Sequence, residues 1–247
     1  MRSFVGLGAL ATLAVLIPQD AASQQAPPRG APPAVVAHTV AVLEGGILTL
    51  PTAPISAGNR GGATPLGAVG NGDATMFLGA LILYRATPIW GFGAAVDFAP
   101  RPTSDPNYGG ASGLTRAHTR SYLTLAGEVR YFPVHTQWFE PWVGLSAGAV
   151  IIADRFTTDA GYDVPPFLGT KSVTESTQGF AGGLKVGADY LVTDRLVIGL
   201  ALGASEWFLP SAIAEQASCD PIGDCPTLQG NVAMFEFGLT LGYRIPL

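Results

Sequence analysis

The stretch NVAMFEFGLTLGYRIPL (residues 231–247) decides the fold class of this chain. From Phe235 to Tyr243 every odd position is large and apolar, whereas the even positions carry Glu236, a threonine or glycine. A period of two indicates a β-strand with one apolar face. The opposite face carries polar residues or glycines and ends at Arg244. The fold therefore depends on which face points outward, and we expect the apolar face to meet lipid.

The composition favours a membrane protein that has no spanning helices. Of the 247 residues, 48% are hydrophobic and only 13% are charged, which is about half the usual charged share. After the first twenty residues, no apolar stretch reaches the ~18 residues that a spanning helix needs. A closed β-barrel is the other structure that a bilayer permits, because it leaves no backbone hydrogen-bonding group unpaired in lipid.

The N-terminus has the pattern of a secretory signal peptide. Arg2 precedes an apolar stretch over residues 4–17, and Ala21 and Ser23 supply small residues before a cleavage site. We expect residues 1–23 to be the signal peptide, with cleavage after Ser23. An uncleaved N-terminal anchor is the alternative, although the apolar stretch is short for one.

The remaining chain divides into a short lead-in and one domain. Residues 24–37 contain four prolines and are expected to be flexible or extended. Residues 38–247 are expected to form the barrel, from eight segments at residues 38–50, 76–84, 89–98, 121–131, 141–151, 180–191, 196–205 and 231–247. The first two are rich in β-formers but alternate poorly.

Long and short connections alternate strictly along these segments. The short ones lie at residues 85–88, 133–137 and 192–194, and the long ones at residues 51–73, 100–115, 157–176 and 210–230. An up-and-down meander would place all short turns at one rim and all long loops at the other. This asymmetry predicts an all-β, eight-stranded antiparallel up-and-down transmembrane β-barrel, with both ends at the short-turn, periplasmic rim.

Aromatic residues fall into two groups that resemble the interfacial girdles of membrane barrels. The group near the short turns comprises Tyr84, Trp90, Tyr131, Phe132, Trp138, Phe139, Trp142, Tyr190 and Tyr243. The group near the long loops comprises Phe77, Phe98, Phe156, Phe180, Trp207, Phe208 and Phe235. A soluble barrel or sandwich with its apolar faces inside stays open as an alternative, because alternation alone does not say which face is outside.

The polar faces of the strands carry a set of ionisable residues that we expect inside the barrel. They are Asp97, Glu128, Arg130, Lys185, Asp189 and Glu236, with Glu44 and Arg244 as further members. Acids and bases nearly balance, so the residues can pair in a medium where an unpaired charge costs several kcal/mol. The network is expected to fill and fix the lumen. A narrow polar path is the second interpretation, because ten inward glycines leave room for water.

The net charge and the two cysteines limit which partners and which covalent or metal sites we expect. The net charge of −5 and the lack of a basic cluster oppose nucleic-acid binding. The only cysteines, Cys219 and Cys225, enclose five residues including proline and glycine. In an exported protein they are expected to form a disulfide. A metal site is the alternative, but no histidine lies nearby to complete it.

Enzymatic interpretations find little support, and we expect no catalysis, cofactor or metal. The three histidines are His38, His118 and His135. Ser121 falls on the strand face opposite His118, so a serine–histidine pair is not expected there. The segment DRFTTDAGYD (residues 154–163) contains three aspartates that could attract Ca²⁺ or lipopolysaccharide cations, but a solvated loop is the favoured interpretation.

Two stretches resemble a known family. RYFPVHTQWFEPWVGLSAGAVI (residues 130–151) resembles the strand–turn–strand of small outer-membrane β-barrel proteins of the OmpA-like and OmpX-like family. GGLKVGADYLVTDRLVIGLALGA (residues 182–204) is similar to a following hairpin. The resemblance implies an eight-stranded barrel that the outer-membrane assembly machinery inserts. Such barrels serve as anchors, adhesins, small channels and enzymes, so the fold does not fix the activity.

These observations predict an integral protein of the bacterial outer membrane with a structural or surface-interaction role. Its partners would be outer-membrane lipid and lipopolysaccharide, and we expect a monomer. A narrow channel for small solutes is the first alternative. A secreted, soluble β-barrel that binds a small ligand is the second.

Overall fold

The structure is a computed structural model, and it describes most of the chain from Ala37 onward. The described residues are 37–54, 71–100, 108–109, 115–134, 136, 138–158, 163–164, 167–168, 172–210, 228 and 230–246. The predicted signal peptide and nearly all of the proline-rich lead-in lie outside them. No helix in this described part is long and apolar enough to cross a membrane.

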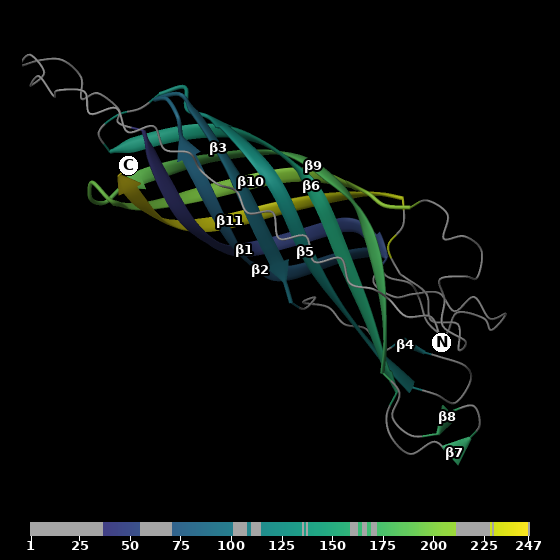
Figure 1. The fold of residues 1–247 in the computed structure, drawn as a ribbon. Helices are drawn as coiled ribbons and strands as arrows, with labels where there is room; N and C mark the ends of the chain where they lie inside the picture. Colours follow the sequence, from purple (N-terminus) through teal and green to yellow (C-terminus); the bar gives the residue numbers. More distant parts are fainter. Residues whose placement is uncertain are drawn as a thin grey trace, which may run out of the picture. The chain divides into compact units, whose positions relative to one another are not determined.

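Eight long strands wrap into a barrel, as the alternating segments predicted (Figure 1). They are β1 (His38–Pro54), β2 (Asn71–Arg85), β3 (Trp90–Ala99), β5 (Thr115–Tyr131), β6 (Phe139–Thr158), β9 (Ser172–Leu191), β10 (Leu196–Phe208) and β11 (Asn231–Pro246). Three two-residue strands accompany them: β4 (Tyr108–Gly109), β7 (Asp163–Val164) and β8 (Phe167–Leu168).

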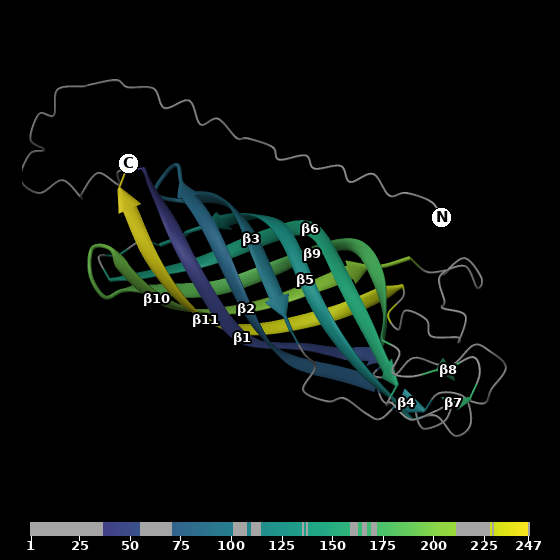
Figure 2. The same ribbon diagram turned by 60° about the horizontal axis from the view of Figure 1, so that its bottom comes forward.

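The barrel is closed and entirely antiparallel. Each long strand pairs with the next one in the sequence, and β1 pairs with β11 to join the two ends. His38 lies opposite Pro246 at one end of this pairing, and Thr49 lies opposite Phe235 at the other. Closure leaves no unpaired sheet edge around the barrel. The prediction of an eight-stranded up-and-down barrel is confirmed (Figure 2).

In each of the three short turns, a threonine hydroxyl accepts a hydrogen bond from the backbone amide of the residue three positions further on. Thr87 accepts from Trp90 at 3.0 Å, Thr136 from Phe139 at 2.9 Å, and Thr193 from Leu196 at 2.9 Å. Each acceptor satisfies the backbone N–H of the residue that begins the next strand. His38 and Pro246 lie at this same rim, so the described ends of the barrel are on the short-turn side, as predicted.

Three neighbouring strands continue beyond the rest at the opposite rim. The β9–β10 pairing ends where Phe208 meets Phe180, yet β9 stays paired with β6 as far as Ser172. On the other side, β3 ends where Ala99 meets Tyr122, while β5 continues alongside β6. Strands β5, β6 and β9 therefore form a three-stranded extension on the long-loop side (Figures 1 and 2).

The poor alternation of the first two strands has a packing cause. Their inward side chains include Val40, Val42 and Leu50 from β1 and Phe77 and Leu83 from β2, all of them buried. Their outward side chains, such as Leu43 and Ile82, are also apolar but exposed. Apart from Glu44 and Asp73, most of their inward side chains are apolar as well, so the period of two is hidden in the sequence.

Candidate functional site

The outer face of the barrel is a continuous apolar surface. Its members alternate with inward residues along every long strand and are between about one third and two thirds exposed. They include Leu43, Ile47, Leu78, Ile82, Phe92, Leu125, Leu145, Leu184, Ile198, Leu200, Leu202, Phe237, Leu239 and Leu241. A soluble protein does not leave so large an apolar area in water. The orientation is therefore the one predicted for contact with lipid, and the soluble alternative would need the opposite one.

Two aromatic girdles border this apolar surface. The turn-side girdle consists of Tyr84, Trp90, Tyr131, Trp138, Phe139, Tyr190 and Tyr243. The loop-side girdle consists of Phe98, Phe180, Phe208 and Phe235. Neighbouring strands pair their rings, as in Trp90–Tyr131 at 5.0 Å and Phe180–Phe208 at 6.3 Å between centroids. Two such belts mark where a bilayer's interfaces would lie.

Four aromatic residues that we assigned to the girdles belong to the interior instead. Phe77, Phe132, Trp142 and Trp207 are each at most 1% exposed. Their positions along the strands have inward parity, so nearness to a turn or loop was the wrong criterion. The side chain of Phe156 lies outside the described residues.

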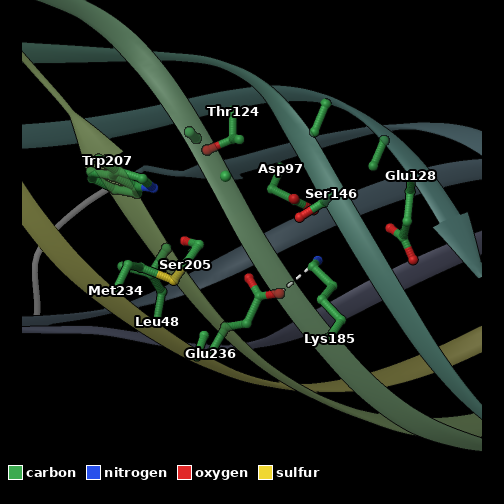
Figure 3. Close-up of a pocket in the computed structure, with 15 residues that line it drawn as sticks. Leu48, Asp97, Thr124, Glu128, Ser146, Lys185, Ser205, Trp207, Met234 and Glu236 are labelled. Carbon is green, nitrogen blue, oxygen red and sulfur yellow. Dashed lines mark ion pairs between the residues drawn. The ribbon is translucent and has the colours of Figure 1, made fainter.

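The middle of the lumen holds a group of ionisable side chains that we call the charged layer: Glu44, Asp97, Glu128, Arg130, Lys185 and Glu236. The Lys185 ammonium lies 2.6 Å from a Glu236 oxygen (Figure 3), and Arg130 Nε donates to Glu128 at 2.5 Å. The Arg130 guanidinium also lies 3.7 Å from the ring centroid of Trp142. Four carboxyl groups thus share two cationic side chains, so the layer contains more acids than the near-balance expected from the sequence.

Glycines of neighbouring strands make room for these side chains. A Cβ at Gly203 would collide with the Glu236 carboxylate, and one at Gly238 would collide with Glu44. A Cβ at Gly79 would likewise meet Asp97. The space left by these inward glycines is occupied by carboxylates, and this explains why glycine alternates with large residues along β10 and β11.

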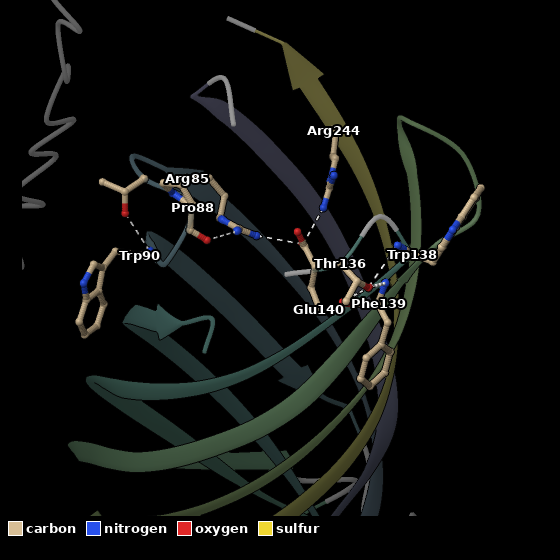
Figure 4. Close-up of polar contacts among 9 residues, drawn as sticks. Arg85, Pro88, Trp90, Thr136, Trp138, Phe139, Glu140 and Arg244 are labelled. Carbon is tan, nitrogen blue, oxygen red and sulfur yellow. Dashed lines mark hydrogen bonds and ion pairs between the residues drawn. The ribbon is translucent and has the colours of Figure 1, made fainter. Parts of the chain in front are cut away.

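The short-turn end of the lumen holds a second group, which we call the turn-side layer: Arg85, Glu140 and Arg244. Glu140 accepts from Arg85 at 3.0 Å and from Arg244 at 2.6 Å (Figure 4). Arg85 also donates to the Pro88 carbonyl at 2.5 Å and lies 3.6 Å from the centroid of the Phe132 ring. One carboxylate therefore joins β2, β6 and β11 at this end.

The long-loop end of the lumen is mainly apolar, and we call it the loop-side apolar layer. It consists of Leu48, Leu50, Ala53, Phe77, Ala99, Tyr122, Val150, Ile152, Ala181, Trp207, Leu209, Leu228, Val232 and Met234. One buried ion pair borders it, with Arg120 Nε 2.8 Å from Asp154. Asp73 is a third member of this group. One of its carboxylate oxygens lies 3.7 Å from Arg120 and accepts a hydrogen bond from the Tyr122 hydroxyl.

Little empty volume remains between these layers. A cavity of about 30 Å³ lies beside Asp97, Lys185 and Glu236, and another of about 20 Å³ lies beside Arg85 and Glu140. Each is large enough for about one or two waters. Trp142 stacks on Arg130 of the charged layer and fills further space. Among the described residues, the lumen is a packed core with small cavities lined by polar side chains.

All eight residues predicted for the interior network have side chains on the lumen side. Six of them form the charged layer, Asp189 lines the cavity beside Arg85, and Arg244 belongs to the turn-side layer, where it contacts Glu140. Sequence analysis missed Asp73, Arg85, Arg120 and Glu140. Each lies one to three residues beyond the end of a predicted strand segment, and continuing the inward alternation by that distance reaches it.

The prediction that residues 154–163 form a solvated loop is wrong for Asp154. This residue is fully buried within β6 and ion-paired to Arg120, which lies directly opposite on β5, so it is not part of a solvated loop. Asp159 lies outside the described residues. So do Cys219 and Cys225, and their disulfide stays a prediction. Within the described residues, no group of three or more histidine, cysteine or acidic side chains is arranged to hold a metal ion.

Neither a protein-family model nor a curated protein sequence matches this chain. Solved structures with a similar architecture include a neisserial surface protein A, with TM-score 0.48, 12% identity and coverage of 85% of this chain and 99% of that one. Ail of Yersinia pestis gives TM-score 0.41 and 12% identity over 85% and 99% of the two chains. OprG of Pseudomonas aeruginosa gives TM-score 0.43 and 15% identity, with coverage of 87% of this chain and 99% of that one.

Proposed function

We propose that this chain is an integral protein of a bacterial outer membrane with a structural or surface-interaction role and without catalysis. One observation carries the proposal: the apolar side chains point outward between two aromatic girdles, and the ionisable ones point inward. The same observation argues against the soluble barrel. That protein would have to expose the charged layer to water and bury Leu239 and its neighbours.

A role at the cell surface is favoured by the extension of β5, β6 and β9. Its outward side chains are polar and include Thr119, Ser121, Arg155, Ser176 and Gln178. They begin where the apolar surface ends, so this part of the wall suits water rather than lipid. With the short turns at the periplasmic rim, the extension would stand on the outer side of the membrane, where a partner can reach it.

The packed lumen supports a barrel that does not conduct. Cavities of about 30 and 20 Å³ are separated by buried side chains, so ions have no continuous wet path through the described interior. In planar bilayers we expect no unitary conductance steps from the purified barrel. Reproducible steps would favour the narrow channel and would require the layers to rearrange.

The location is tested by expressing the full chain and fractionating the envelope. We expect the protein in the outer-membrane fraction, running faster on a gel before boiling than after, because a closed barrel resists detergent. A band confined to the periplasm or medium, with no shift on boiling, would contradict the proposal and favour the secreted ligand-binding barrel.

A further inference from the structure

A pocket of about 380 Å³ opens on the short-turn rim, outside the lumen. It is lined by Ala37, His38, Asp194, Arg195, Arg244 and Pro246. Two arginines and a histidine face a single acid there. This composition indicates a site for an anion rather than for a cation or an apolar group.

Barrel closure assembles the pocket from three separate segments. His38 begins β1 and lies opposite Pro246 near the end of β11. The Arg244 amide donates to the Arg195 carbonyl at 2.7 Å, which ties the β9–β10 turn to β11. The basic side chains are therefore held at one place by the backbone, although they are far apart in the sequence.

Both arginines are held in place by contacts within the protein. Arg195 Nη1 donates to the Tyr243 hydroxyl at 3.3 Å, which holds its exposed guanidinium against the barrel wall. Arg244 gives Nη2 to Glu140 at 2.6 Å, while its Nε is buried without a hydrogen-bond partner. The buried Nε is out of reach of a ligand, so Arg244 contributes positive charge to the inner wall of the pocket, and Arg195 is the arginine whose guanidinium is exposed.

The depth of the pocket suits the head-group layer of a membrane. Tyr243 belongs to the turn-side girdle, and the lining residues Arg244 and Pro246 follow it by one and three positions. At about 3.3 Å per residue and a tilt of about 40°, they lie roughly 3 to 8 Å beyond the girdle. Lipid phosphates are found at that level, directly outside the aromatic belt.

We propose that this rim pocket binds a phosphate group, and that the phosphate belongs to an anionic phospholipid of the leaflet on the short-turn side. The inference rests on the proposed membrane location. Arg195 supplies the donors, Arg244 adds positive charge at the inner wall, and His38 lines the side next to β1. A planar guanidinium can contact two phosphate oxygens at once, which favours arginine for this task.

The test is native mass spectrometry of the full chain folded in detergent micelles, with phosphatidylglycerol and phosphatidylcholine titrated separately. We expect one phosphatidylglycerol to be retained per barrel, at least about fivefold more tightly than phosphatidylcholine. Arg195→Gln should lower the phosphatidylglycerol affinity about fivefold and leave the boiling shift unchanged, because this side chain is exposed and outside the packed lumen. Arg155→Gln is the matched control at the opposite rim and should have no effect.

Equal retention of the two lipids, or an Arg195→Gln variant that binds like the parent, would overturn the inference while leaving the proposed function intact. Inorganic phosphate that binds in an Arg195-dependent way, without lipid retention, would overturn the lipid source. Absence of a boiling shift in the parent chain would count against both proposals.

Discussion

The charged layer and the loop-side apolar layer fill the same lumen by opposite means. In the charged layer, Lys185 and Glu236 are both nearly inaccessible and are stabilised by each other. In the loop-side apolar layer, Trp207 packs against Tyr122 at 5.4 Å between ring centroids, as in the core of a soluble protein. The difference teaches that an inward position in this barrel need not be polar. It must only be filled, either by hydrocarbon or by partners that satisfy one another.

The largest expected effect comes from opening the loop-side apolar layer. Trp207→Ala removes a fully buried indole, and we expect the free energy of unfolding to fall by about 3–5 kcal/mol because a cavity is left. Urea titration of the barrel in lipid vesicles measures this change. Phe208→Ala is the matched control one residue along, on the outer face, where a loss of about 1 kcal/mol is expected. Equal losses at both positions would mean that the inward and outward faces of β10 are misassigned.

A similar loss is expected when the charged layer is broken on one side only. Lys185→Met leaves Glu236 buried without its ammonium partner, which should lower the free energy of unfolding by about 3–5 kcal/mol. Adding Glu236→Gln to Lys185→Met should restore most of the loss, because the uncompensated charge is gone. The same urea titration compares the single and double variants. Additive losses in the double variant would show that the two residues do not act as a pair.

A smaller effect should follow from filling the space that glycine leaves for a carboxylate. At Gly203 an added methyl group collides with Glu236, so Gly203→Ala should lower the free energy of unfolding by about 1–3 kcal/mol. Gly45→Ala is the control, since a Cβ there lies 3.5 Å from the nearest atom of Leu78 and faces outward. Equal stability of the two variants would indicate that the Glu236 side chain has a different position.

The barrel could be predicted from the sequence because the patterns that indicate it are local and are repeated along the chain. Alternation in β10 and β11, and the strict order of long and short connections, needed no knowledge of which strands touch. The charged layer was also accessible, since Glu128, Lys185 and Glu236 interrupt otherwise small or apolar faces. Their pairing was not, because Lys185 and Glu236 belong to β9 and β11, which are not adjacent. The two side chains meet over Gly203 of the intervening strand β10.

The loop-side apolar layer could not be predicted from the sequence, for a physical reason. When both faces of a strand are apolar, as in β1 and β2, period two disappears, and a buried Phe77 looks like a lipid-facing one. Trp142 and Trp207 were predicted to be in the girdles because they lie near a short turn and a long loop in the sequence, whereas their parity places them inside. The extent of β5, β6 and β9 beyond the apolar surface was also missed, since polar residues on both faces resemble a loop.

The central claim is that the apolar face of each strand meets lipid, and Leu239→Arg tests it most directly. Leu239 is exposed and lies midway between Phe235 and Tyr243, which belong to the two girdles. An arginine at the midplane of a bilayer should lower the free energy of unfolding in vesicles by about 2–4 kcal/mol. Unchanged stability in vesicles, as at a water-exposed surface position, would contradict the claim and place this face in water.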